Sequence, residues 1–274
     1  MPAVSFEEFE TLVSGIELTY TLGRRISDAV GGQPCEYFIQ EATMAFVKLL
    51  MSVQAFLRFI PSSKFHAQEV EFAVDLSSAS VMARQVMEDA ITFFYLSEPN
   101  LTTEEQVFRR LVWQLHGATE TLEALEYLVP ERTDTQLTID ALNRAKETLN
   151  EPLYAAMLNK IKGDRRGRIR KGKEGHVLHD EEVLSRRGIQ LDAYRFWSKT
   201  LSNFAHFSTL SHQLMMQTTS DWKSSWKAFY AAAVCVAKLT AEAVVVFIET
   251  FPTTRSLLTA QEHAAIANLR SPIR

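Results

Sequence analysis

Residues Tyr194 to Met215 read YRFWSKTLSNFAHFSTLSHQLM, and their apolar side chains recur with the period of an amphipathic helix. At 100° per residue, seven apolar residues share one face, which we expect to pack in a core: Phe196, Trp197, Leu201, Phe204, Phe207, Leu214 and Met215. The opposite stripe is polar and comprises Arg195, Ser198, Lys199, Ser202, His206, Thr209 and Gln213. Such a stripe is either a solvated surface or one wall of a polar cleft, since both settings accept charged and hydroxyl groups.

Helical spacing of apolar residues recurs through the rest of the chain. Long helices are predicted at about residues 5–29, 36–60, 64–96, 104–128 and 220–251, with glycine and proline breaks between several of them. Ser5 and Glu8 form the sequence pattern of a capping box at the start of the first helix. The sequence therefore predicts an all-α fold, a multi-helix bundle of about seven to nine helices.

The chain of 274 residues, 46% of them hydrophobic, is long enough to bury a large core. Its ten glycines and eight prolines are scattered, so no flexible linker separates domains. We expect a single helical domain over residues 1–274 with a basic mobile loop at about residues 160–180. That loop is expected because residues 160–173, KIKGDRRGRIRKGK, hold eight Lys or Arg residues and few groups to bury.

The cysteines and the N-terminal residues indicate the cellular compartment of the protein and whether it binds a metal or another cofactor. The only two cysteines, Cys35 and Cys235, lie in apolar patterns and are expected to be reduced core thiols. No Cys/His cluster has the spacing of a metal site, so neither a metal nor another cofactor is expected. The N-terminal residues are acidic and lack the features of a secretory signal, which predicts a cytoplasmic protein.

The most membrane-like stretch is residues 228–251, but Lys238 and Glu242 lie near its middle. A bilayer would penalise each of these charges by ~3 kcal/mol. Because the two residues are four apart, they can pair on one helix face. We therefore expect a central helix of a bundle and no membrane partner.

A charged pair marks the predicted helix at residues 76–96, which is apolar in nearly every direction. Arg84 and Glu88 stand one turn apart on the same side, and buried ions persist only when they are paired and hydrogen-bonded. One interpretation is an internal salt bridge that fixes the packing. The other is that the pair faces Ser202 and His206 across a shared polar pocket.

A net charge of −4 and a pI near 6.0 argue against a generally basic protein that coats nucleic acid. A polyanion would therefore need a local basic patch, and the stretch at residues 160–173 is the one place that offers it. It is either a solvated connection or an RNA-binding segment that holds phosphates. The candidate RNA-binding residues are Arg165, Arg166, Arg168, Arg170, Lys171 and Lys173. The stretch has no interleaved aromatic residues for base stacking and no phosphate-loop motif.

Two of these stretches together resemble a known family. SVMARQVME at residues 80–88 is followed by LSRRG at residues 184–188, and then by Tyr194, Ser202 and His206 on one predicted helix. This pattern resembles an uncharacterised family of bacterial and archaeal helical proteins, which shows an Arg-x-x-x-Glu helix, a short helix ended by glycine, and a tyrosine-led helix carrying Ser-x-x-x-His. The resemblance covers roughly residues 36 to 250 and implies a fold and a candidate site more than a reaction.

The architecture is more distantly similar to the HEPN superfamily of helical bundles, several of which are ribonucleases of toxin–antitoxin and phage-defence systems. Those enzymes carry an arginine and a histidine on one helix, separated by four to six residues, and act as dimers. Arg109 and His116 fit that spacing, although Arg110 stands where the enzymes often have a polar residue such as asparagine or aspartate. The separation of Arg195 and His206 is too long. The resemblance implies a metal-independent ribonuclease and a homodimer.

Metal-free RNA cleavage needs a base for the 2′-hydroxyl proton and cations for the charge that develops on phosphate. Our first hypothesis assigns this chemistry to His206, Arg84, Glu88 and Ser202, with the basic loop attracting RNA. Arg109 with His116 is the competing catalytic pair. The second hypothesis is a non-enzymatic helical interaction module that dimerises or binds a protein partner, with the polar residues serving only the packing.

Overall fold

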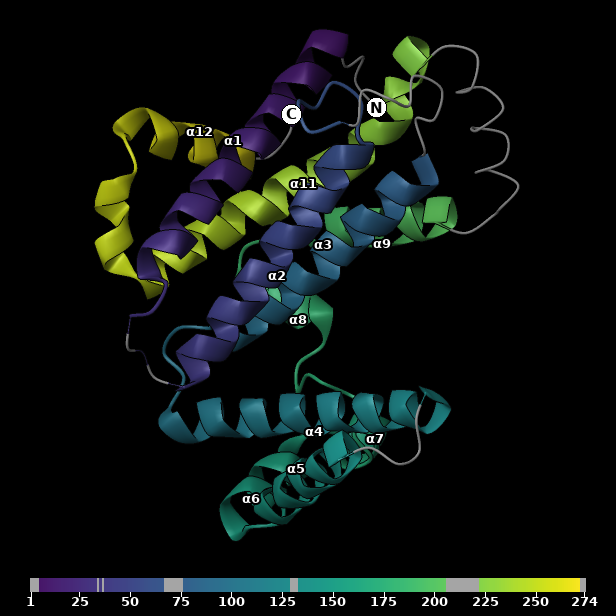
Figure 1. The fold of residues 1–274 in the computed structure, drawn as a ribbon, viewed down its shortest axis with the longest axis vertical. Coiled ribbons are helices and arrows are strands. Elements are labelled where there is room, and N and C mark those ends of the chain that lie inside the picture. Colours follow the sequence, from purple (N-terminus) through teal and green to yellow (C-terminus); the bar gives the residue numbers. More distant parts are fainter. Residues whose placement is uncertain are drawn as a thin grey trace. The chain divides into compact units, whose positions relative to one another are not determined.

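The computed structural model describes residues 5–33, 35, 37–66, 76–128, 133–205 and 222–271 (Figure 1). All regular secondary structure in these ranges is helical, so the all-α prediction is confirmed. The described ranges contain eleven α-helices and one 3₁₀ helix, which exceeds the seven to nine that were expected. Short helices were also expected at about residues 135–150, 152–162, 180–188 and 260–269, and the structure has a helix in each of these places. The helices at Gly163–Arg170 and Pro252–Leu257 fall where no helix was expected, because they carry too few periodic apolar residues to be recognised from sequence.

The described residues group into two compact units. The first comprises Met1–Ser97 with Val183–Arg274, and the second comprises Glu98–Glu182. Helix α8 (Asp180–Arg186) begins in the second unit and ends in the first. The single domain over residues 1–274 stays a prediction, and a calorimetric scan with one unfolding transition would support it.

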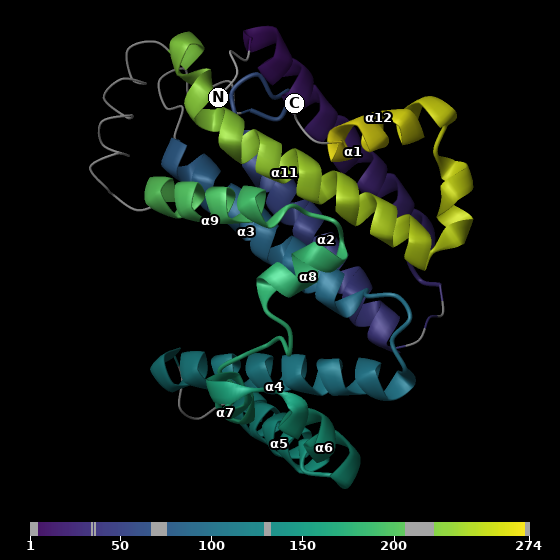
Figure 2. The same ribbon diagram turned by 180° about the vertical axis from the view of Figure 1, so that it is seen from behind.

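The first unit is a bundle arranged around its longest helix, α11. Its helices are α1 (Phe6–Val30), α2 (Tyr37–Phe59), α3 (Leu76–Leu96), α9 (Leu191–Ala205), α11 (Trp222–Thr250), the 3₁₀ helix η1 (Pro252–Leu257) and α12 (Ala260–Arg270). Helix α11 packs chiefly against α1 and α3, and it also contacts α2, α9 and α12. Figure 2 shows α9 crossing α3 at an angle in this unit, where the two helices pack against each other.

Aromatic stacking joins three helices in the core of this unit. The Phe46 ring of α2 stacks on the Phe247 ring of α11 with centroids 4.2 Å apart, and lies 5.2 Å from the Phe93 ring of α3. All three side chains are buried, and burial of each contributes about 1.5–3 kcal/mol. The predicted capping box is confirmed, because Glu8 N donates to Ser5 Oγ and Ser5 N donates to the Glu8 carboxylate.

Two segments are long and apolar enough to cross a membrane by length and composition alone, Ile39–Phe59 and Phe229–Thr250. The apolar window of Phe229–Thr250 is 83% buried inside the protein. This burial is the environment that was expected for residues 228–251 as the central helix of a bundle, although core helices and membrane spans share the same composition. The cytoplasmic location stays a prediction.

The second unit has its own small core. It is built from α4 (Thr103–Leu128), α5 (Thr133–Leu149), α6 (Pro152–Lys160) and α7 (Gly163–Arg170). Its buried residues come from all four helices: Phe108, Leu111, Val112, Leu115, Ala145, Leu149, Leu158 and Ile169. The Phe108 and Tyr154 rings also stack within it, with centroids 6.4 Å apart.

Helix α7 corrects the expectation of a loop at about residues 160–180. Residues 163–170 are helical, and Ile169 is fully buried in the core of the second unit. Asp164 lies in the first turn, where a carboxylate favours helix formation through the helix dipole. The burial of Ile169 and the ion pairs of Arg165 and Arg168 with Glu174 hold this segment in place, and a single apolar residue gives no periodic signal in the sequence.

A candidate polar site on helices α3 and α9

The outward side of α3 carries the predicted charged pair. Helix α3 buries its other sides against α2, α9 and α11, and it leaves Val81 41% exposed. The side chains of Arg84 and Glu88 are 42% and 52% exposed. A helix that is apolar in nearly every direction is expected to be surrounded by others, but this stripe of α3 faces outward. The pair is half-exposed, so it needs no deep desolvation to form.

Arg84 joins the two helices of the candidate site. Its Nε donates to Glu88 Oε1 at 3.0 Å, and its Nη1 donates to Ser202 Oγ of α9 at 3.4 Å. The second bond is at the long end of the accepted range and adds little stability. The exposed pair with Glu88 contributes about 0.3–0.5 kcal/mol, as other i,i+4 ion pairs do. The arrangement therefore positions a guanidinium at the surface more than it holds the fold together.

Helix α9 presents Ser202 because its apolar side chains anchor the opposite face. Trp197, Leu201 and Phe204 are buried, as the sequence periodicity predicted. Phe196 was also expected in the core but is 45% exposed, since it stands at the edge of the apolar stripe rather than at its centre. Helix α9 is described as far as Ala205. His206 and the later part of the predicted helix lie outside the described residues, so the convergence of an imidazole on Arg84 stays a prediction.

A second polar network on α3 was not anticipated from the sequence. Ser52 Oγ of α2 donates to Asp89 Oδ2 at 2.6 Å, and Gln85 Nε2 donates to Asp89 Oδ1 at 2.9 Å. This network links α2 to α3 one residue beyond Glu88. The sequence signal was the adjacency of two acidic residues, whose side chains must point to different sides of a helix.

Arg109 and His116, the alternative catalytic pair, have separate partners within the second unit. Arg109 is only 6% exposed, and its Nη1 lies 2.5 Å from Glu98 Oε2. His116 Nδ1 lies 2.9 Å from the Gly172 carbonyl oxygen, which requires a proton on Nδ1, and its Nε2 lies 3.3 Å from Glu120 Oε1. These contacts give each residue a structural role.

A close approach of chain segments explains the position of His116. Gly172 has φ +68°, and a Cβ at this residue would lie 1.9 Å from Thr119 Oγ1 of α4. A side chain is therefore excluded where the Gly172 carbonyl meets the imidazole. The contact between His116 and the Gly172 carbonyl therefore requires glycine, both for the positive φ and for the lack of room for a Cβ atom.

Most of the candidate RNA-binding cations contact groups of their own unit. Glu174 accepts from Arg165 Nη2 at 3.0 Å and lies 3.5 Å from Arg168 Nη2. Arg170 donates to Asn159 Oδ1 at 3.4 Å, and Lys173 forms an ion pair with Glu123. The remaining two candidates, Arg166 and Lys171, have no ion pair within the described part of the chain. The basic stretch is thus partly neutralised, which lowers the potential available to a polyanion.

The described residues contain no group of three or more His, Cys, Asp or Glu side chains arranged to hold a metal ion. Protein-family models, curated proteins and solved structures offer no match to this chain. The polar site on α3 and α9 therefore has to be interpreted from its own chemistry.

Proposed function

We propose that this chain is a HEPN-like, metal-independent ribonuclease whose active site includes Arg84, Glu88 and Ser202. One observation supports the proposal: a half-exposed arginine, fixed by a carboxylate on its own helix, reaches a hydroxyl on a helix far away in the sequence. Structural ion pairs of surface helices need no such second helix. A guanidinium held in this way is ready for an incoming phosphate.

The residues divide the reaction as follows. Arg84 binds the scissile phosphate and stabilises the negative charge that develops on it. Glu88 holds the guanidinium in place, and Ser202 donates a further hydrogen bond to a phosphate oxygen. His206, assigned from the sequence, takes the proton of the 2′-hydroxyl group, whose oxygen then attacks the phosphorus. The bond from phosphorus to the 5′-oxygen breaks, which leaves a 2′,3′-cyclic phosphate, and the departing 5′-oxygen takes a proton from the imidazolium or from water. Arg166 and Lys171, exposed or half-exposed on the other unit, supply positive charge for the attraction of RNA.

The test is cleavage of mixed RNA by the purified protein in EDTA. Cleavage is expected with the wild type, and His206→Ala is expected to abolish it without lowering the melting temperature. His116→Ala is the matched control for the alternative pair, and it should retain cleavage. Intact RNA with the wild-type protein would contradict the proposal, and so would loss of activity in His116→Ala alone.

A second candidate function, a non-enzymatic dimerisation module, rests on the outer face of α2. Met44, Val47 and Met51 are 67%, 42% and 62% exposed and recur at the spacing of one helix face. Exposed apolar stripes of this kind mark protein contacts. If two copies pair their α2 helices antiparallel, Met44 of one faces Met51 of the other, which gives a self-complementary interface.

Light scattering on a sizing column distinguishes the two functions. Suppose that the wild-type protein is a dimer, that Met51→Glu makes it a monomer, and that the protein leaves RNA intact. This result would support the dimerisation module and contradict the ribonuclease proposal. A dimer with RNA cleavage fits the nuclease, because HEPN-like ribonucleases act as dimers. Lys48→Gln, at an exposed position of the same helix beside the stripe, changes the net charge by the same one unit and should retain the dimer.

A further inference from the structure

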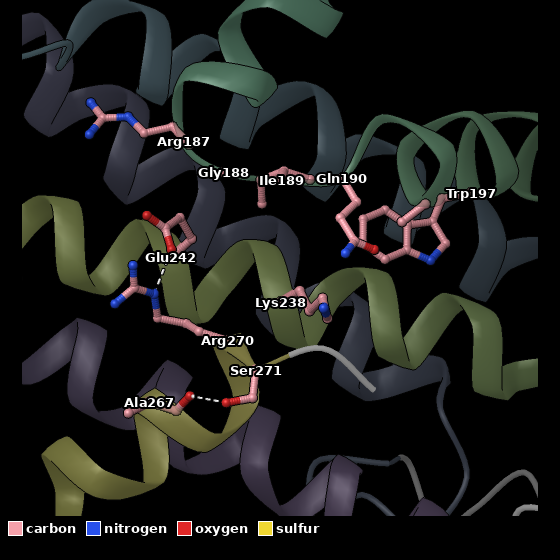
Figure 3. Close-up of a pocket in the computed structure, with 11 residues that line it drawn as sticks. Arg187, Gly188, Ile189, Gln190, Trp197, Lys238, Glu242, Ala267, Arg270 and Ser271 are labelled. Carbon is pink, nitrogen blue, oxygen red and sulfur yellow. Dashed lines mark hydrogen bonds and ion pairs between the residues drawn. The ribbon is translucent and has the colours of Figure 1, made fainter. Parts of the chain in front are cut away.

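A polar cavity of about 380 Å³ lies in the first unit, where the start of α9, the middle of α11 and the end of α12 meet (Figure 3). Its volume is in the range that small-molecule sites occupy. The side chains that matter for its chemistry are Gln190, Trp197, Lys238, Glu242, Arg270 and Ser271. The cavity does not include Arg84, Glu88 or Ser202, and the inference drawn from it is independent of the ribonuclease proposal.

The ion pair in the cavity wall differs from the one expected from the sequence. Glu242, only 8% exposed, accepts a hydrogen bond from Arg270 Nε at 2.6 Å (Figure 3). The anticipated partner, Lys238, forms no ion pair within the described residues. Among the described residues, the Arg270 guanidinium has no other hydrogen-bond partner. The donors on its two terminal nitrogens are therefore available to a ligand.

Lys238 is therefore a half-buried ammonium group at a cavity without a counter-ion of its own among the described residues. Burial lowers the pKa of Lys238, because a partly dry environment disfavours the charged amine. Such a group costs stability unless an anion compensates it. Glu242 is the single carboxylate among the described residues that line the cavity, and Arg270 already neutralises it.

Two further features favour an anion. Gln190 and Ala193 place the N-terminal end of α9 at the cavity, where free backbone N–H groups and the helix dipole attract negative charge. Arg187 also lines the cavity, but its guanidinium donates to the Ser97 carbonyl at 3.0 Å and lies 5.8 Å from the Phe94 ring centre. Arg187 thus adds positive potential without being a direct ligand.

We propose that this cavity binds a small phosphate monoester of the size of a nucleoside monophosphate. Lys238 and the terminal nitrogens of Arg270 contact the phosphate, whose double charge matches two cations better than a carboxylate does. Gln190 provides an amide donor for a remaining oxygen, whereas the Ser271 hydroxyl already donates to the Ala267 carbonyl at 3.2 Å. The esterified group lies against Trp197 and Ile189, the apolar part of the wall.

Titration calorimetry of the full chain tests the proposal with adenosine monophosphate, inorganic phosphate and adenosine as probes. Adenosine monophosphate should bind, inorganic phosphate should bind more weakly, and adenosine should not bind at millimolar concentration. Lys238→Gln should weaken nucleotide binding about tenfold or more, because it removes a charge-assisted hydrogen bond. Lys199→Gln, at an exposed lysine of α9 outside the cavity, should bind like the wild type.

Three results would overturn the proposal. These are no binding of either phosphate probe, equal binding of adenosine and its monophosphate, and unchanged nucleotide affinity in Lys238→Gln. Circular dichroism of each variant shows whether it is folded. Arg270→Lys is the second variant, since it keeps a cation for Glu242 but loses the terminal nitrogen pair, and it should also weaken nucleotide binding.

Discussion

Arg84 and Ser202 stand 118 positions apart in the chain, yet Arg84 Nη1 donates a hydrogen bond to Ser202 Oγ at 3.4 Å. A bond of this length cannot hold two helices together. The contact instead results from the packing of α9 through Trp197, Leu201 and Phe204, which turns its polar face toward the exposed stripe of α3. The fold thus assembles the polar groups by burying apolar ones.

Ser202→Ala separates a catalytic role from a packing role. The free energy of unfolding should fall by less than about 1 kcal/mol, because the lost hydrogen bond is long and part-exposed. RNA cleavage should fall about tenfold or more, since a donor to the phosphate is removed. Urea denaturation and initial cleavage rates measure the two effects. Ser198→Ala, one turn earlier on α9, is the control and should change neither quantity appreciably.

Arg109→Met should destabilise the protein strongly. Arg109 is buried against Glu98, and removing one partner of a buried pair leaves an uncompensated charge that costs about 3–5 kcal/mol. Arg144→Met, at an exposed position of the same unit, should cost less than about 0.5 kcal/mol. Chemical denaturation compares the two variants. Loss of RNA cleavage in Arg109→Met with unchanged stability would instead support the alternative catalytic pair.

The two cysteines should differ sharply in reactivity. Cys235 is fully buried, and burial raises the pKa of its thiol well above the ordinary value, so little thiolate forms and reagents cannot reach it. Cys35 is exposed and precedes α2, which corrects the expectation of a core position. Titration with a thiol-specific chromogenic reagent should release one equivalent rapidly and a second only in denaturant. Cys35→Ser should remove the rapid phase, and fast labelling of native Cys235 would contradict its burial.

Lys238→Met should raise the melting temperature of the ligand-free protein at pH 7. The pKa of Lys238 is lower in the folded state than in the unfolded chain, so the unfolded state binds more protons between those two pKa values. The energetic cost of this lysine is therefore full below its folded pKa and declines as the pH rises toward the unfolded value. The gain in melting temperature should shrink between pH 7 and pH 10. A gain that grows with pH would contradict this assignment.

Local patterns made the fold predictable, and long-range pairs did not. The Ser5–Glu8 cap and the buried face of α11 follow from spacings within a few turns of one helix. Helix α7 was missed because its stability comes from the burial of Ile169 and from ion pairs with Glu174 outside the helix. Neither contact has a periodic signature in the sequence.

The candidate sites show the same limit. The pairing of Arg84 with Glu88 could be predicted because the two residues are one turn apart on one helix. The same i,i+4 spacing suggested that Lys238 pairs with Glu242. In the structure Glu242 instead pairs with Arg270, which lies 28 positions further along the chain. Only the packing of α12 near α11 reveals that choice and the cavity beside it.

Cleavage of RNA by Arg84→Gln tests the central proposal most directly. The initial rate in EDTA should be about 100-fold lower than that of the wild type, because the guanidinium stabilises charge in the transition state. The free energy of unfolding should change by less than about 1 kcal/mol, since the ion pair is half-exposed. A folded Arg84→Gln variant that cleaves RNA at the wild-type rate would contradict the account.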